Sequence, residues 1–340
     1  MYSFINDYSE GAHEKIIEAL VSTNREQNCG YGLDKHCENA RHLIQKEIGR
    51  KSDIHFLVGG TQANFTVISA LLRPHQGVIS ADTGHINVHE SGAIEATGHK
   101  VLAIKTNNGK ITAQQAEKML DAHYGDESFE HTVQPGMVYI SHPTELGTIY
   151  TKAELTALSE TCAKYKIPLF LDGARLGCAL TAEGTDVTLK DIAELTDVFY
   201  IGGTKMGALF GEAVVINSKE LGKDFRYILK QHGGMLAKGR LLGIQFEELF
   251  KDGLYFKLAE HAVKTAQKIR KTMEVKGYKF AADSPTNQIF PIMPKTKLKE
   301  IENDFSVEFK EKYDEENDIV RVCTSWATDE KEAEKFLRKI

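Results

Sequence analysis

The sequence lacks several features that mark particular classes of protein. Among its 340 residues no apolar run approaches the roughly 20 that a membrane-spanning helix needs. The five cysteines are odd in number, scattered and without a Cys-x-x-Cys pair, so we expect neither a disulfide framework nor a zinc knuckle. The 42 Lys and Arg are outnumbered by 48 Asp and Glu, and the resulting net charge of −6 argues against nucleic acid as the main partner.

The composition favours a soluble globular protein. Hydrophobic residues make up 41% of the chain and charged residues 26%, which suits a large packed core rather than a disordered chain. The length predicts one large domain, or one with a smaller companion. The first residues include early acidic side chains and no apolar signal core, so we expect a cytoplasmic protein.

Short apolar runs that predict buried strands recur through the first two thirds of the chain. They lie at 54–58, 77–81, 101–104, 137–141, 168–172, 198–201 and 212–216. Because these runs are continuous rather than alternating, the strands are expected to be covered by helices on both faces. Helical patterns at 60–72 and 152–166 lie between them. The sequence therefore predicts an α/β domain with a mostly parallel sheet.

The character of the chain changes after the last of these strands. Residues 218–276 are almost wholly helical in pattern, with a break at Gly233-Gly234. Short strands and a final helix follow at 288–293, at 319–323 and from Asp329. We expect a large domain over residues 1–250, including an N-terminal arm, and a small α+β domain over residues 251–340.

Residues suited to chemistry follow the ends of the predicted strands. Asp172 ends one strand and Lys205 lies just past another, while the turn at 59–61 follows a third. His85 and Glu90 follow a fourth. Because ligands of open parallel sheets bind at the carboxyl ends of the strands, these residues are candidates for one site.

The turn Gly59-Gly60-Thr61 is a candidate anion site. Free backbone N–H groups and the positive end of a helix dipole would suit one phosphate. The turn is not G-x-G-x-x-G and lacks the acidic residue that would bind a ribose, which excludes a dinucleotide site. Ordinary turn chemistry is the alternative.

Lys205 and Asp172 together indicate a candidate cofactor site. A lysine flanked by Thr and Gly after an apolar strand is either a solvated loop residue or a reactive amine. Pyridoxal phosphate needs an amine for a Schiff base, a carboxylate for its ring nitrogen and a cradle for its phosphate. An aspartate 33 residues before such a lysine, together with the glycine turn, favours this cofactor.

Over nearly its whole length the sequence resembles the low-specificity threonine aldolases, pyridoxal-phosphate lyases of the aspartate aminotransferase fold. The matching segments are Asn6-Asp7, Tyr31-Gly32-x-Asp34, Phe56-Leu57-x-Gly-Gly-Thr-Gln-Ala-Asn64, His85 with Glu90, Leu171-Asp-Gly-Ala-Arg175, the Lys205 segment, Gly233-Gly234-Met235 and Val320-Arg-Val-Cys-Thr324. Asp-Gly-Ala-Arg and Gly-Thr-Gln-Ala-Asn are the most specific of them.

The resemblance implies a role for each residue that would hold pyridoxal 5'-phosphate. Lys205 would form the Schiff base, Asp172 would keep the pyridine nitrogen protonated, and His85 would stack on the ring, with a helix-capping histidine as the alternative. The phosphate would be bound by Gly60, Thr61 and Thr204.

The substrate residues are implied in the same way. Arg175 and Arg321 would grip the substrate carboxylate, which suits the planar guanidinium fork. Alternatively, Arg175 would pair with Asp172 and Arg321 would be a solvated strand charge. Tyr31 would reach the site from a neighbouring subunit, so the resemblance implies a homodimer or homotetramer.

The implied reaction is cleavage of the Cα–Cβ bond of a β-hydroxy-α-amino acid, giving glycine and an aldehyde. A base must remove the β-hydroxyl proton, and we expect His85 to do so, with Glu90 nearby. The implied substrates are threonine and allo-threonine.

Three departures from the family pattern affect the substrate side. Glu145 stands where a histidine usually faces the substrate, and Asn6 replaces a serine or threonine. Leu236 replaces an arginine that supports the phosphate, a task for which Lys238 and Arg240 are candidates.

Two other functions stay open. One is another pyridoxal-phosphate enzyme, either a β-eliminating lyase or an aminotransferase, and the other is a non-catalytic binding protein of the same fold. His85 and His89 would share one helix face, but without a third ligand we expect no metal site.

Overall fold

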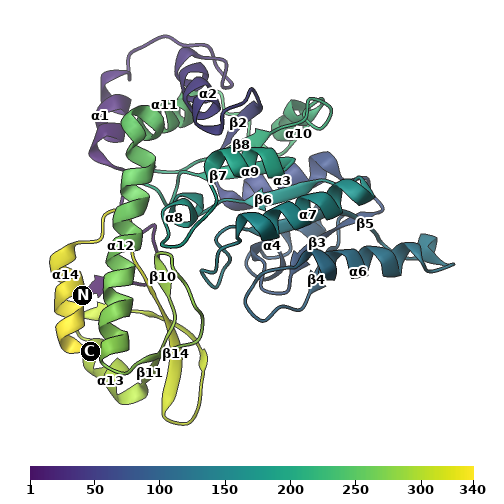
Figure 1. Ribbon diagram of the computed structural model, residues 1–340. Coiled ribbons are helices and arrows are strands. Elements are labelled where there is room, and N and C mark those ends of the chain that lie inside the picture. Colours follow the sequence, from purple (N-terminus) through teal and green to yellow (C-terminus); the bar gives the residue numbers. More distant parts are fainter.

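The computed structural model describes residues 1–340 and is built around a seven-stranded sheet, which Figure 1 shows among the helices. The strand order is β2-β8-β7-β6-β5-β3-β4. The strands are β2 (Asp53–Leu57), β3 (Gln76–Ala81), β4 (Val101–Ile104), β5 (Gln134–Ser141), β6 (Leu169–Asp172), β7 (Val198–Gly202) and β8 (Glu212–Ile216). Only β8 runs antiparallel to its neighbours. The predicted α/β fold with a mostly parallel sheet is confirmed.

Helices cover both faces of this sheet. Consecutive residues of β6 show why: Leu169 and Leu171 belong to one core cluster, and Phe170 between them belongs to a second. The helices before β8 are α1 (Glu14–Ser22), α2 (Lys35–Ile48), α3 (Gly60–Leu71), α4 (His85–Val88), α5 (Ala93–Ala96), α6 (Ala113–Tyr124), the 3-10 helix η1 (Phe129–His131), α7 (Lys152–Tyr165), α8 (Leu176–Leu180) and α9 (Leu189–Leu195). The continuous apolar runs thus reflect burial on both faces.

The segment after β8 is helical, as predicted, but in three pieces. These are α10 (Phe225–Gln231), α11 (Arg240–Phe250) and α12 (Leu254–Val275), with the 3-10 turn η2 (Lys251–Gly253) before α12. The predicted break at Gly233-Gly234 falls in the loop after α10, where Gly233 has a φ of +72°.

The C-terminal part forms a smaller, mixed layer with its own core. Its elements are β9 (Lys279–Phe280), β10 (Gln288–Ile289), β11 (Pro291–Pro294), α13 (Lys295–Ile301), β12 (Phe305–Ser306), β13 (Glu308–Lys312), β14 (Asn317–Cys323) and α14 (Glu330–Lys339). Strands β10, β14, β11 and β9 lie in that order, with β13 pairing to β14. Both termini lie here (Figure 1), because β1 (Tyr2–Ser3) pairs with β12.

The sequence did not predict β1, β9, β12 or β13. Three of these have only two residues, and β13 reads Glu-Phe-Lys-Glu-Lys, the charged pattern of an edge strand rather than of a buried one. The proposed domain boundary at residue 250 falls at the end of α11. Helix α12, which follows it, packs against both α8 and α14.

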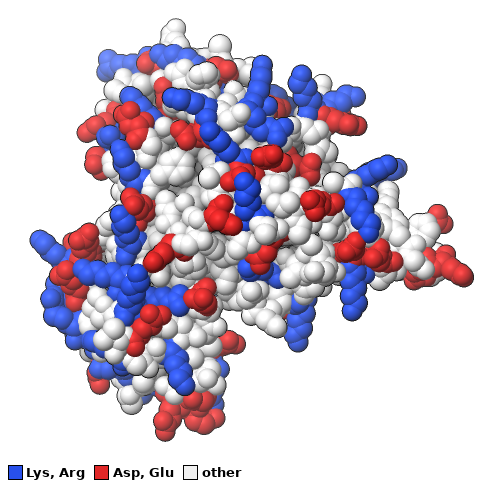
Figure 2. Space-filling model, viewed as in Figure 1, with Lys and Arg blue, Asp and Glu red and all other residues white.

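No helix is long and apolar enough to cross a membrane. On the face shown in Figure 2, Lys and Arg are interspersed with Asp and Glu rather than gathered into a patch of one sign.

Candidate active site

A pocket of 490 Å³ lies between the carboxyl edge of the central sheet and the C-terminal layer. Its lining residues are Tyr8, Asp82, Thr83, His85, Val88, His89, Glu145, Leu146, Arg175, Lys205, Gln288, Glu308, Lys310 and Arg321. Of the predicted site residues, this pocket brings together Lys205, His85, Arg175, Arg321 and Glu145.

Asp172, the last residue of β6, lies buried beside this pocket among hydrogen-bond donors. The hydroxyls of Tyr139 on β5 and Tyr200 on β7 donate to its two oxygens. Asn64 Nδ2 donates at 3.1 Å and the backbone N–H of Ala174 at 3.0 Å. Burial alone would raise the pKa of Asp172, but the charge of His85 and the tyrosine hydroxyls outweigh it and lower the pKa. The carboxylate is therefore ionised.

Lys205 lies on the turn between β7 and β8, half-buried in the pocket wall. The turn is tight: Gly203 donates its backbone N–H to the carbonyl of Gly211, and a Cβ on Gly203 would meet that oxygen at 2.8 Å. Desolvation and the charge of Arg175 lower the pKa of the Lys205 amine. A lysine with a depressed pKa is the form suited to nucleophilic chemistry.

Glu212, a buried carboxyl group beside Lys205, was missed by the sequence analysis. It begins β8, and because β8 is antiparallel its first residue lies at the carboxyl edge of the sheet. Thr204 Oγ1 donates to Glu212 Oε1 at 2.9 Å, while Oε2 is buried without a partner. Burial raises the pKa of Glu212 to about 8. A charged residue opening an apolar strand was the only signal in the sequence.

His85 begins α4 and is held by Glu90. Its Nδ1 lies 2.7 Å from Glu90 Oε1, and that oxygen also accepts from Asn64 Nδ2 at 2.7 Å. Burial would lower the pKa of His85, but the hydrogen bond with Glu90 and the charge of Asp172 raise it above its ordinary value. His85 therefore favours the cationic form, and Asn64 links its partner Glu90 to Asp172.

The glycine turn opens α3, as predicted. Gly59 caps the helix in an extended conformation without a side-chain hydrogen bond, so the first N–H groups of the helix stay free. A Cβ on Gly60 would approach the Tyr200 hydroxyl to 3.1 Å, which explains why this position has no side chain. Thr204, predicted to share the phosphate, is engaged with Glu212.

Arg175 is paired with a buried carboxylate, though not with Asp172. Its Nε and Nη2 donate to the two oxygens of Asp7 at 2.6 and 2.9 Å, and Asn287 Nδ2 donates to Asp7 at 2.9 Å. Arg175 and Asn287 lower the pKa of Asp7 to about 2 although burial opposes it. Arg175 keeps Nη1 free of any hydrogen bond within the chain.

Arg321 on β14 is also engaged. Nη1 donates to Gln288 Oε1 at 2.9 Å, Nη2 donates to the carbonyl of Ile5 at 2.9 Å, and Nη2 forms an ion pair with Glu308. Its Nε is buried without a partner. The N-terminal arm thus contacts both arginines, Asp7 through Arg175 and Ile5 through Arg321.

Glu145 has a contact that the sequence did not suggest. Its Oε1 accepts from the backbone N–H of His85 at 2.9 Å and from Ser141 Oγ at 2.6 Å. Burial raises the pKa of Glu145. The side chain therefore caps α4 from the loop after β5.

Asn6, Tyr31 and Arg240 do not line this pocket and make other contacts. Asn6 Oδ1 accepts from the N–H of Tyr8 at 3.0 Å. Tyr31 is 45% exposed at a φ of +61° and donates its N–H to the carbonyl of Leu236. Arg240, a candidate replacement for the missing arginine, donates instead to the carbonyl oxygens of residues 23 and 24.

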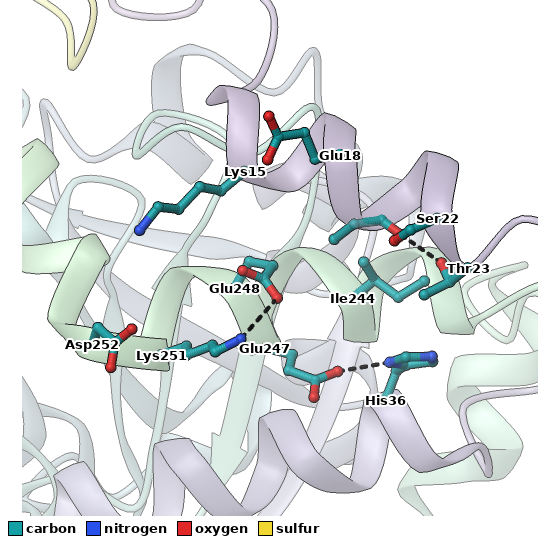
Figure 3. A pocket seen from close by; sticks show the side chains of 11 residues that line it. Lys15, Glu18, Ser22, Thr23, His36, Ile244, Glu247, Glu248, Lys251 and Asp252 are labelled. Carbon is teal, nitrogen blue, oxygen red and sulfur yellow. Dashed lines mark hydrogen bonds and ion pairs between the residues drawn. The ribbon is translucent and has the colours of Figure 1, made fainter.

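A second cavity of 460 Å³ lies between α1 and α11 (Figure 3). Two pairs of its polar side chains are in contact: His36 Nδ1 lies 2.7 Å from Glu247, and Lys251 lies 3.9 Å from Glu248. None of the predicted site residues lines it.

Comparisons with known proteins bear on the chemistry of the Lys205 pocket. The family model described as Beta-eliminating lyase matches residues 6–295. A low specificity L-threonine aldolase of a Pseudomonas species is 30% identical over 312 residues, which cover 88% of this chain and 86% of the relative.

Solved structures agree with this match. A structure of Leishmania major threonine aldolase is 47% identical with a TM-score of 0.96, and the alignment covers 99% of this chain and 98% of the other. A Thermus thermophilus aspartate aminotransferase is 15% identical with a TM-score of 0.72, and the alignment covers 100% of this chain and 90% of the other. The second match shows the fold alone.

Proposed function

Because the chain belongs to the β-eliminating lyase family, we propose that it is a pyridoxal-phosphate-dependent threonine aldolase. It cleaves threonine or allo-threonine to glycine and acetaldehyde. The observation that carries the proposal is the half-buried Lys205 amine beside an ionised Asp172 that accepts four hydrogen bonds.

The residues present fit the proposed cofactor. A buried carboxylate stays ionised only when donors surround it, and the two tyrosines and Asn64 keep Asp172 in the form that holds a protonated ring nitrogen. Lys205 supplies the amine. The open start of α3, crowded against Tyr200 at Gly60, supplies N–H groups for a phosphate.

When bound, pyridoxal phosphate supplies an electron sink for the bond that breaks at Cα. Lys205 would hold the cofactor through Nζ, and its free amine would be placed to carry a proton to or from Cα. His85, oriented by Glu90, would stack on the ring. Asp172 would keep a proton on the ring nitrogen.

The arginines orient the substrate carboxylate. Arg175 has Nη1 available in the pocket, while its other nitrogens are fixed by Asp7. Arg321 is neutralised by Glu308, so this ion pair must open, or the carboxylate must bind at Arg175 alone. Gly60 and Thr61 would bind the phosphate through the start of α3, whereas the Thr204 hydroxyl already donates to Glu212.

The proposal includes an assembly of two or four chains in the cytoplasm. Tyr31 lies outside the Lys205 pocket of its own chain and is exposed, which suits a residue that completes the pocket of a neighbour. All five cysteines are free thiols, which suits a reducing compartment.

The function is tested by incubating the cofactor-loaded protein with L-threonine, L-allo-threonine, L-serine and L-cysteine. We expect glycine and acetaldehyde in equal amounts from the first two, and no product from Lys205→Ala. Pyruvate without glycine would contradict the aldolase assignment in favour of β-elimination, and a keto acid would indicate an aminotransferase.

A further inference from the structure

His89 is a pocket residue to which no role has been assigned so far. It caps the C-terminal end of α4, one helical turn after His85, and the two ring centroids are 5.5 Å apart. It lines the same pocket as Lys205, Arg175 and Arg321. We propose that His89 accepts the β-hydroxyl proton of the substrate during cleavage, an inference that rests on the proposed function.

The binding of His85 makes it a poor proton acceptor. Its Nδ1 is engaged by Glu90 at 2.7 Å, so only Nε2 could take a proton. The hydrogen bond with Glu90 and the charge of Asp172 raise the pKa of His85, so its ring stays protonated to a higher pH than a free imidazole. We therefore assign the role of proton acceptor, which the sequence suggested for His85, to His89. His85 would stack on the cofactor ring.

The environment of His89 lowers the pKa of its ring, whereas that of His85 raises it. Neither ring nitrogen makes a hydrogen bond within the chain. The charged groups facing it are His85 on α4, Glu308 and Lys310 on β13, and Arg321 on β14. Partial burial of the ring, then the positive charges of His85 and Lys310, lower the pKa of His89 below its ordinary value. The imidazole is therefore neutral at neutral pH and has a lone pair to accept a proton.

The position of His89 suits a group that meets the substituent on Cβ. It lines the pocket together with Arg321, the candidate carboxylate anchor, and its ring centroid lies 5.5 Å from that of His85.

Each carboxylate that lines the pocket has at least one oxygen engaged within the chain. Asp82 Oδ1 accepts from the N–H and hydroxyl of Thr106 at 3.0 and 2.9 Å. Glu145 caps α4, and Glu308 is paired with Arg321. Of the two histidines that line the pocket, His89 is the one whose ring nitrogens have no partner within the chain.

The step conserves atoms and electrons. The O–H proton moves to a ring nitrogen of His89, the O–H electron pair becomes the second C–O bond of the aldehyde, and the Cα–Cβ pair stays with the glycine fragment. A proton then restores the second hydrogen on Cα, and His89 loses its proton to solvent. No oxidant or reductant is consumed.

The test compares cofactor-loaded wild-type protein with His89→Phe and His89→Asn. Loss of general-base catalysis predicts that kcat for L-threonine or L-allo-threonine cleavage falls about 10²–10⁴-fold in both variants. Glycine has no Cβ and hence no β-hydroxyl, so the affinity of each variant for glycine, measured by calorimetry, should stay within about twofold of that of the wild type. The wild-type kcat should decline at acid pH as His89 is protonated, and this decline should be absent from the residual activity of the variants.

His131→Phe removes an exposed histidine on η1, outside the pocket, and serves as the matched control. Wild-type kcat in His89→Phe, or a parallel loss of glycine affinity, would overturn the proposal. If the wild-type protein itself cleaves no β-hydroxy amino acid, the proposed function fails and His89 has no proton to accept. That failure is seen in the wild type, whereas failure of the His89 inference alone is seen only in the variants.

Discussion

The buried pair of Asp7 and Arg175 joins the N-terminal arm to the edge of the central sheet. The Asp7 side chain is fully buried and that of Arg175 is 13% exposed. Removing one partner of a buried pair leaves an uncompensated charge and costs about 3–5 kcal/mol. An unfolding entropy of about 2.1 cal/mol/K per residue gives about 0.7 kcal/mol/K for 340 residues. Asp7→Asn should therefore lower the Tm by about 4–7 °C.

Scanning calorimetry of the wild-type protein and three variants measures this. Asp283→Asn is the control, because Asp283 pairs with Arg270 but is 92% exposed, and loss of such a pair should cost no more than about 1 kcal/mol. Asp7→Asn with Arg175→Met removes both charges and should lose less than Asp7→Asn alone. A Tm for Asp7→Asn within about 1 °C of the wild type would refute the reasoning.

The acid dependence of this pair has a definite sign. The folded pKa of Asp7, about 2, lies below its ordinary value of 3.8, so ionised Asp7 stabilises the fold above that value. This stabilisation is lost as the pH falls through about 2. The Tm difference between wild type and Asp7→Asn should therefore shrink as the solution is acidified below about pH 4. A constant difference would contradict the assigned pKa.

Three further predictions concern buried carboxyl groups. Asp172→Asn should weaken cofactor affinity roughly 10- to 150-fold, because a hydrogen bond to a charged group contributes about 1.5–3 kcal/mol. Equilibrium titration of the protein with pyridoxal phosphate measures this affinity. An unchanged affinity would exclude Asp172 as the partner of the ring nitrogen. Glu212 has a folded pKa of about 8 against an ordinary 4.5, so the free energy of unfolding of the wild type should fall as the pH rises between these values. In Glu212→Gln this fall, measured by urea unfolding at about pH 5 and pH 8, should be smaller. An equal fall in both proteins would contradict the assigned pKa. Glu145→Ala should destabilise the fold by about 1–2 kcal/mol in thermal unfolding, because α4 loses its cap. Glu145→Gln keeps an acceptor oxygen and should cost less than half as much. Equal losses would mean that Glu145 does not act as a cap.

Much of the sheet could be predicted because its strands are buried on both faces. Such strands are continuous apolar runs, and the residues that follow them, Asp172 and Lys205 among them, must lie at the carboxyl edge. The same reasoning fails for β13, a charged strand of the C-terminal layer whose residue Glu308 meets Arg321.

The partners of the site residues could not be predicted, because they depend on which strands are neighbours. Tyr139 and Tyr200 reach Asp172 since β5 and β7 flank β6, an order that the apolar runs do not reveal. Glu212 lies at the same edge only because β8 runs antiparallel. Asp7 meets Arg175 across 168 residues of chain. Each contact depends on the order of the strands, the direction of a strand or the path of the chain through the fold, rather than on local sequence.

Identification of the amine that holds the cofactor tests the central claim most directly. Borohydride reduction of the protein loaded with pyridoxal phosphate, followed by proteolysis and mass spectrometry, locates the labelled lysine. The account predicts one pyridoxyl group per chain on Lys205, and none in Lys205→Ala. A label on Lys310, the other lysine that lines the pocket, or labels spread over surface lysines would contradict it.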